Sequence, residues 1–259
     1  MALHSRSEIS TAKRVVIKVG SSSISGKNAA KIANLVEAMA KAHKSGQEVI
    51  LVTSGAIATA IPLLNLESRP DDLATSQALA SVGQGRLIAR YQDSLERYDI
   101  IAGQVLLTAQ DLEGSETSAN AKSAMQRLLE LRVIPIVNEN DTVATAEIRF
   151  GDNDRLAALV AVLVEADALI LLSDVDALYD MPPSQTGAKR IETVGFGQDL
   201  SSFDIGGSSS DVGTGGAVTK VAAAEIATNA GIAVLLTSAD NVSMALGGEA
   251  IGTWFEAKG

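Results

Sequence analysis

The sequence contains no cysteine and only two histidines, and these absences exclude several kinds of chemistry. Without thiols the chain has no disulfide, no thiolate nucleophile and no cysteine-ligated metal. It fits a reducing compartment, and we expect a cytoplasmic protein. His4 lies in a polar tail and His43 on a helix face that we expect to be exposed, so we expect no mechanism based on histidine.

Aromatic residues and long apolar runs are also scarce. Aromatics make up 3% of the 259 residues and hydrophobic residues 46%, so the core must consist mainly of small aliphatic side chains. The longest apolar run, Leu156 to Val164, is too short to span a bilayer. Met1 to Ala12 lacks the apolar core of a signal peptide. We expect residues 1–12 to form a flexible tail, and we expect no membrane partner.

Positive charge is in deficit, with a formal net charge of −10 and no cluster of Lys and Arg. Nucleic-acid binding depends on such clusters, so we expect no nucleic-acid partner. An acidic surface also repels anionic ligands at long range. Any phosphate chemistry must therefore depend on a few local lysines.

Apolar strand-like runs alternate along the chain with segments of helical spacing. The predicted strands are Arg14–Val19, Glu48–Val52, Ile100–Leu107, Val133–Val137, Ala168–Leu172 and Ile232–Leu236. The predicted helices are Ala29–Lys44, Gln77–Tyr98, Ser118–Leu131, Arg155–Ala166 and Ala217–Ala230. Strands that are apolar throughout are covered on both faces. The sequence therefore predicts an α/β fold, a three-layer αβα sandwich around a mainly parallel sheet.

The remaining segments complete this interpretation. Pro135 cannot donate to a strand ladder, so its strand is predicted to be bent or to lie at an edge. Thr145–Phe150 alternates and predicts a short hairpin strand, whereas Met181–Gly187 and Asp199–Thr214 predict long loops. No linker divides the chain, so we expect one domain over residues 13–259.

Two lysine motifs suit a bound phosphate. Lys18, Gly20 and three serines follow the first strand, at the edge of the sheet where α/β proteins bind ligands. Gly213, Thr214, Gly215 and Gly216 lead into a helix that carries Lys220. Glycines let backbone amides approach an anion, and a helix start adds positive potential. The alternatives are an exposed lysine beside a turn and a flexible loop before a helix.

Hydroxyl, amide and carboxylate groups follow three further strands. Ser54 and Gly55 follow the second strand and predict an anion site, with a capping serine as the alternative. Asn138 and Asp141 follow the fourth strand, and Asp152, Asn153 and Asp154 lie in the next loop; together they suit a zwitterionic amino acid. A calcium site and helix capping by Asp154 are the alternatives, although the 12-residue calcium loop pattern is missing.

Ser173 and Asp174 follow the fifth strand. Their place fits the ribose or base edge of a nucleotide, with the carboxylate accepting from hydroxyl groups. A simple turn after a buried strand is the alternative.

Taken in order, these blocks resemble the amino acid kinase family. The resemblance extends from Val15 to Phe255 and includes Lys18–Ser23, Val52–Ala58, Ile134–Glu147 and Gly213–Lys220. It is strongest to the members that phosphorylate the γ-carboxylate of L-glutamate with ATP and Mg²⁺, the first step of proline biosynthesis. It implies that residues of about 13–165 bind the amino acid and residues of about 166–259 bind the nucleotide.

The resemblance also implies a role for each site residue. Lys18 and Lys220 would stabilise the transferring phosphoryl group, and Asp154 would hold the two lysines in position. The residues that would surround glutamate are Ser54, Gly55, Asn138, Asp141, Asp152 and Asn153. The residues that would bind ATP are Ser173, Asp174, Gly213, Thr214, Gly215, Gly216 and Lys220. No residue is predicted to ligate the metal directly, which the phosphates would hold.

Several points stay open at this stage. The chain departs from the family pattern at Thr59–Pro62 and at Ala177. The alternative functions are kinases of N-acetylglutamate, aspartate, carbamate or UMP, and a non-catalytic nucleotide-binding protein. The resemblance implies a homo-oligomer (dimer or tetramer) and feedback inhibition by proline. Because the sequence ends at Gly259, the PUA domain of many members is expected to be absent.

Overall fold

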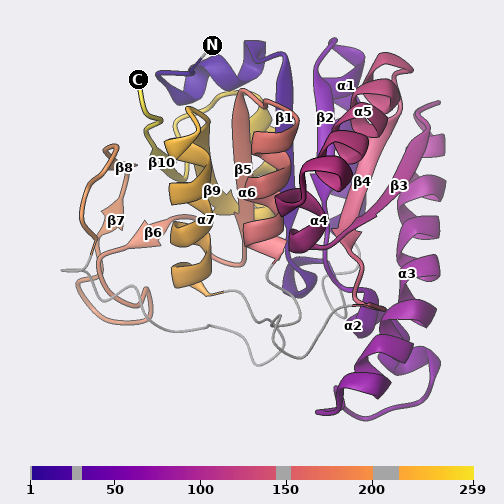
Figure 1. The fold of residues 1–259 in the computed structure, drawn as a ribbon. Coiled ribbons are helices and arrows are strands. Elements are labelled where there is room, and N and C mark those ends of the chain that lie inside the picture. The colour runs from indigo at the N-terminus through magenta and orange to yellow at the C-terminus, as the bar shows by residue number, and fades with distance from the viewer. Residues whose placement is uncertain (1, 25–30, 144–152, 201–215) are drawn as a thin grey trace.

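The computed structural model describes residues 2–24, 31–143, 153–200 and 216–259. Within these residues an eight-stranded sheet has the order β3-β4-β2-β1-β5-β9-β10-β8, with helices on both faces (Figure 1). The strands are β1 (Arg14–Val19), β2 (Glu48–Val52), β3 (Ala102–Leu107), β4 (Ile134–Glu139), β5 (Ala168–Ser173), β8 (Thr193–Val194), β9 (Ala233–Ser238) and β10 (Thr253–Phe255). A separate pair consists of β6 (Leu178–Tyr179) and β7 (Arg190–Ile191).

The helices lie between the strands, as the alternating pattern predicts. They are α1 (Lys31–Lys44), α2 (Ala56–Leu63), α3 (Leu73–Glu96), α4 (Ala109–Glu113), α5 (Ser115–Glu130), α6 (Asn153–Leu163), α7 (Ala217–Asn229) and α8 (Val242–Leu246). Neighbouring strands from β3 to β9 run parallel, and only the pairing of β10 with β9 is antiparallel in the main sheet of the described residues. The predicted α/β class with a mainly parallel sheet is confirmed.

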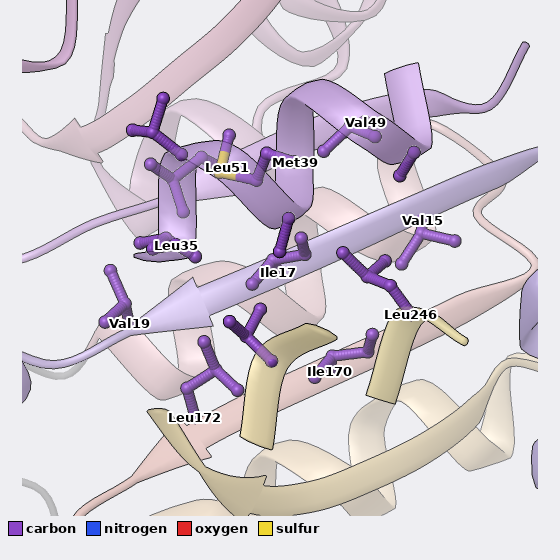
Figure 2. Close-up of a cluster of buried hydrophobic side chains, with 14 of the residues drawn as sticks. Val15, Ile17, Val19, Leu35, Met39, Val49, Leu51, Ile170, Leu172 and Leu246 are labelled. Atoms are coloured by element: carbon purple, nitrogen blue, oxygen red, sulfur yellow. The ribbon is translucent and has the colours of Figure 1, made fainter. Parts of the chain in front are cut away.

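Alternation along β1 builds the two outer layers. Val15, Ile17 and Val19 pack into one cluster with α1, α3 and α8, part of which Figure 2 shows. Val16 points to the other face and packs with α5, α6 and α7. Both clusters are mainly aliphatic, as the shortage of aromatics requires. Lys18 shares the parity of Val16, so the pleat aims it toward α6 and α7.

Pro135 lies in an interior strand, so the predicted edge position is wrong. β4 has β3 on one side and β2 on the other. The amide of Ile134 donates to Ile101 on the β3 side, so the nitrogen of Pro135 faces β2. Pairing of β4 with β2 begins only at Ile136. The missing N–H therefore falls just before that ladder and interrupts no bond in it.

His43 and the N-terminal residues are also less exposed than the sequence suggested. His43 is 8% exposed because it lies four residues after Met39, on the buried face of α1. Arg6–Thr11 forms a short 3₁₀ helix, and its Ile9 is fully buried in the α1-side cluster. Residues 6–11 thus differ from the expected flexible tail. The predicted hairpin strand Thr145–Phe150 lies outside the described residues, as does most of the predicted loop Asp199–Thr214.

Helices α2 and α3 form a pair that extends beyond the end of the sheet (Figure 1). Their contact is closest at Gly83, where an added Cβ would lie 1.8 Å from the backbone oxygen of Ala56. Only glycine fits there without moving one helix. In the described part of the chain, no helix combines the length and apolar character needed to cross a membrane.

We expect Gly83→Ala to lower the free energy of unfolding by about 2 kcal/mol, because the new methyl group must push α2 and α3 apart. Gly85 is the matched control: it lies on the same helix and an added Cβ would meet nothing within 4 Å. Gly85→Ala should stabilise the protein by up to ~1 kcal/mol through helix propensity. Urea denaturation of both variants measures this, and equal stabilities would contradict the close contact.

Candidate functional site

The ends of four adjacent strands, β4, β2, β1 and β5, open into one cavity of about 650 Å³. Strand order explains why residues far apart in the sequence meet there, since the carboxyl ends of parallel strands share one edge of the sheet. The predicted site residues that line it are Lys18, Ser54, Gly55, Asn138, Asp141, Asn153, Ser173, Asp174 and Lys220. The structure therefore brings most of the predicted set together.

The other predicted site residues lie behind the cavity or outside the described residues. Asp154 is 1% exposed and contacts both cavity lysines from the interior. Gly216 is the N-cap of α7. Asp152 and residues 213–215 lie outside the described part of the chain.

Lys18, Asp154 and Lys220 form a buried cationic cluster. Lys18 Nζ lies 2.7 Å from Asp154 Oδ1, and Lys220 Nζ lies 3.2 Å from Asp154 Oδ2. Thr219 Oγ1 donates to Asp154 Oδ2 over 2.8 Å. Lys18 comes from the end of β1, whereas Asp154 and Lys220 come from the first turns of α6 and α7. The two helices pack together and α6 lies against β1, so three remote segments converge.

The cluster brings two ammonium groups and one carboxylate together in a buried place, and the charge of Asp174 also acts on Lys220. Burial alone would raise the pKa of Asp154, but Lys18 and Lys220 outweigh it and lower that pKa to about 2. The pKa of Lys220 is lowered, first by burial and then by the charge of Lys18, while Asp154 partly opposes the shift. One carboxylate thus stands between two ammonium groups. An anion in the cavity would be attracted by both ammonium groups.

The turn after β2 lies directly against the loop after β1. Gly55 has φ of +105°, which favours glycine, and an added Cβ there would lie 3.4 Å from Ser21 Cβ. Gly55 is the N-cap of α2, and as a glycine it has no side chain to cap that helix start. The first residues of α2, at positions 56–58, line the cavity. Two glycine turns and a helix start thus border one space, which suits an anionic group.

An amide network also lines the cavity, beside the end of β4. Asn153 Nδ2 donates to the backbone oxygen of Thr53 over 2.5 Å and to Asn138 Oδ1 over 2.8 Å. Asn138 Nδ2 donates to Gln84 Oε1 over 2.6 Å. Asn153 is 2% exposed, and its Oδ1 is buried without a hydrogen-bond partner among the described residues. The amide of Asn153 is thus fixed on its nitrogen side at the lining of the cavity.

Asp141 and Arg69 bring opposite charges to the amide side. Burial raises the pKa of Asp141 to about 6, and the charge of Arg69 opposes this shift. The pKa of Asp141 in the folded protein is higher than its usual value. Ionisation of this carboxyl therefore lowers the free energy of unfolding as the pH rises through about 6. A carboxylate kept at such a cost in a cavity indicates a functional role.

Several cavity residues were missed by the sequence analysis. Glu67, Ser68 and Arg69 line the cavity from the connection between α2 and α3. This connection follows no strand and has no glycine motif, so nothing in the sequence pointed to it. The connection starts near the departure at Thr59–Pro62, where Thr59 Oγ1 donates to the Gly55 oxygen and Ile61 joins the lining.

The described residues include no group of three or more His, Cys, Asp or Glu side chains that could hold a metal ion. Asp174 is a carboxylate at the cavity wall, beside Ser173, which donates to it over 3.1 Å. This set fits Mg²⁺ that arrives on a polyphosphate, since Mg²⁺ keeps most of its ligands from phosphate and water.

A parallel α/β sheet whose edge carries two buried lysines on one carboxylate is the architecture of a phosphate-handling enzyme. The chain belongs to the amino acid kinase family, which matches residues 13–238, and it is a kinase. The structure is also similar to carbamate kinase from Giardia lamblia bound to AMP-PNP, with a TM-score of 0.65 and 14% identity over 96% of this chain and 100% of that one. This likeness supports the fold.

Curated relatives narrow the comparison within the family. A glutamate 5-kinase of Clavibacter michiganensis subsp. michiganensis is 64% identical over 259 residues, which is 100% of each chain. The glutamate 5-kinase of Leifsonia xyli subsp. xyli is 62% identical, covering 98% of this chain and 95% of the relative. That of Thermobifida fusca is 54% identical over 96% of this chain and 66% of the relative.

We expect Asp154→Asn to lower the free energy of unfolding at neutral pH by about 3 kcal/mol, because two buried ammonium groups lose their counterion. The depressed pKa means that this contribution is present above the usual value of 3.8 and is lost as the pH falls through about 2. Urea denaturation should therefore show a difference from wild type that shrinks in acid. Asp240→Asn, which removes an exposed partner of Lys31, should change stability little; equal effects of the two changes would contradict the cluster.

Proposed function

We propose that this chain transfers the γ-phosphoryl group of ATP to the γ-carboxylate of L-glutamate, the reaction of a glutamate 5-kinase and the first step of proline biosynthesis. The observation that carries the proposal is one cavity lined both by a two-lysine anion site and by amide and carboxylate groups. The identity of 64% to a full-length glutamate 5-kinase supports the choice of substrate.

Residues of about 13–165 bind glutamate in this proposal. Asp141 takes the α-ammonium group, and Asn153 lines the same pocket. Arg69 faces the α-carboxylate, as does the turn at Ser54 and Gly55. Asn138 supports Asn153, and Asp152 is assigned to the same pocket by resemblance alone.

Residues of about 166–259 bind ATP. Asp174 accepts from ribose hydroxyl groups beside Ser173, and the start of α7 with the loop before it receives the phosphates. Gly213, Thr214, Gly215 and Gly216 are assigned to this loop by resemblance. When bound, Mg²⁺ supplies positive charge to the β- and γ-phosphates.

The chemistry needs no general base. The side-chain carboxyl of free glutamate has a pKa near ~4.3 and is already a nucleophilic anion at neutral pH. The obstacle is repulsion between this carboxylate and the triphosphate. Lys18 and Lys220 oppose that repulsion and stabilise charge on the transferring group, while Asp154 fixes both lysines at 2.7 Å and 3.2 Å.

Three further proposals rest on the resemblance and the composition. The chain forms a homo-oligomer, either a dimer or a tetramer. Proline inhibits by occupying the glutamate pocket. The absence of cysteine fits a cytoplasmic location.

A hydroxylamine trap tests the function. With ATP, Mg²⁺ and L-glutamate, wild-type protein should form a hydroxamate from the acyl phosphate, and N-acetylglutamate, aspartate, carbamate and UMP should release far less ADP. Lys18→Met and Lys220→Met should each lose at least ~10²-fold in kcat, as expected for a preorganised charge. Lys122→Met is the control, since Lys122 pairs with Glu165 at an exposed position. Near-wild-type turnover in either cavity variant would refute its role.

The pKa of Asp141 gives a second prediction. Below pH of about 6 this carboxyl gains a proton and no longer attracts an ammonium group. We expect kcat/KM for glutamate to fall about tenfold for each further pH unit, with the KM for ATP unchanged. Asp141→Asn should raise the KM for glutamate at neutral pH and remove this acid limb. Initial-rate kinetics over pH measure both, and an unchanged acid limb in the variant would contradict the assignment.

A further inference from the structure

The amide network at the cavity wall has a fixed direction. The backbone oxygen of Thr53 can only accept, so the group of Asn153 that faces it must be the Nδ2 donor. The same Nδ2 also donates to Asn138, which must therefore present its Oδ1. The Nδ2 of Asn138 is then turned away from the cavity, toward Gln84.

Gln84 completes this chain of bonds from outside the cavity. Its Oε1 accepts from Asn138 Nδ2 over 2.6 Å, and Gln84 itself is half-buried on α3 and does not line the cavity. Asn138 is 1% exposed, so water cannot readily replace the acceptor. With Gln84 in place, the side-chain nitrogens of Asn138 and Asn153 both have acceptors. Asn153 Oδ1 is the buried oxygen of the relay that has no partner among the described residues.

Two further contacts, at Gly83 and Tyr91, hold the part of α3 that carries Gln84. Gly83, next to Gln84, touches the backbone of α2 so closely that no Cβ fits. Tyr91 is fully buried and shares a hydrogen bond of 2.9 Å with Thr53 Oγ1. Gln84 and Tyr91 are seven residues apart, about two helical turns, so they lie on one face and reach the ends of β4 and β2.

We propose that Gln84 is a positioning residue for the acceptor substrate: it orients Asn138, which orients Asn153, and so keeps both amides in place at the lining of the glutamate pocket. The inference rests on the proposed function for the identity of the substrate. The relay itself rests on the hydrogen bonds of Thr53, Asn153, Asn138 and Gln84.

Gln84→Met tests this, because it keeps the length of the side chain and removes the acceptor. We expect the KM for glutamate to rise about tenfold, the cost of one buried donor left unpaired. The KM for ATP should stay within about twofold, since the lysine cluster is untouched. Gln84→Glu keeps an acceptor for Asn138 Nδ2 and should restore a KM for glutamate near that of wild type.

Gln92→Met is the matched control, on an exposed position of the same helix, and should leave both KM values unchanged. A wild-type KM for glutamate in Gln84→Met would overturn the proposal, as would equal increases in both KM values. If wild-type protein does not phosphorylate glutamate, the proposed function is wrong, but the relay is not yet contradicted. Crystal structures of wild type and Gln84→Met then decide the relay, and an unchanged bond between Asn138 and Asn153 in the variant would overturn it.

Discussion

The buried contact of Lys18 and Lys220 with one carboxylate is the constraint on which the rest of the site depends. Two ammonium groups within 2.7 Å and 3.2 Å of Asp154 gather charge in the interior. Such a cluster is unfavourable as a structural device, because apolar side chains would fill the same space without desolvating charges. The cluster is explained by an anion that binds to the lysines from the cavity.

The alternation of side chains between the two faces of β1 makes this contact possible. Alternation in β1 places Val15, Ile17 and Val19 on the α1 face, as Figure 2 shows, and turns Lys18 to the other face. There α6 and α7 lie side by side, and both helices begin at the same edge of the sheet (Figure 1). A register slip of one residue would bury Lys18 among the residues of α1 and separate it from Asp154.

The sequence was sufficient for the class, the strands and most of the cavity wall, because these follow from apolar runs and the groups placed after them. The sequence did not predict features that depend on contacts between residues far apart in the chain. Pro135 is tolerated inside the sheet because β2 begins to pair one residue later, and no local pattern encodes that. Arg69 and Gln84 reach the site only through the packing of α3 on α2, which depends on the missing side chain of Gly83.

The two sides of the cavity answer different physical demands. The phosphate side needs charge, because the chain as a whole carries −10 and repels anions at long range. The amino-acid side needs direction, since a zwitterion presents opposite charges only a few bonds apart and a uniform field cannot orient it. Amides provide that direction, because each one has a donor and an acceptor at fixed positions. An amide can also turn over, so the relay requires a terminus that only accepts, and the backbone oxygen of Thr53 provides it. Lysine charge and directed amide dipoles in one cavity together bring a carboxylate to a phosphate without a base.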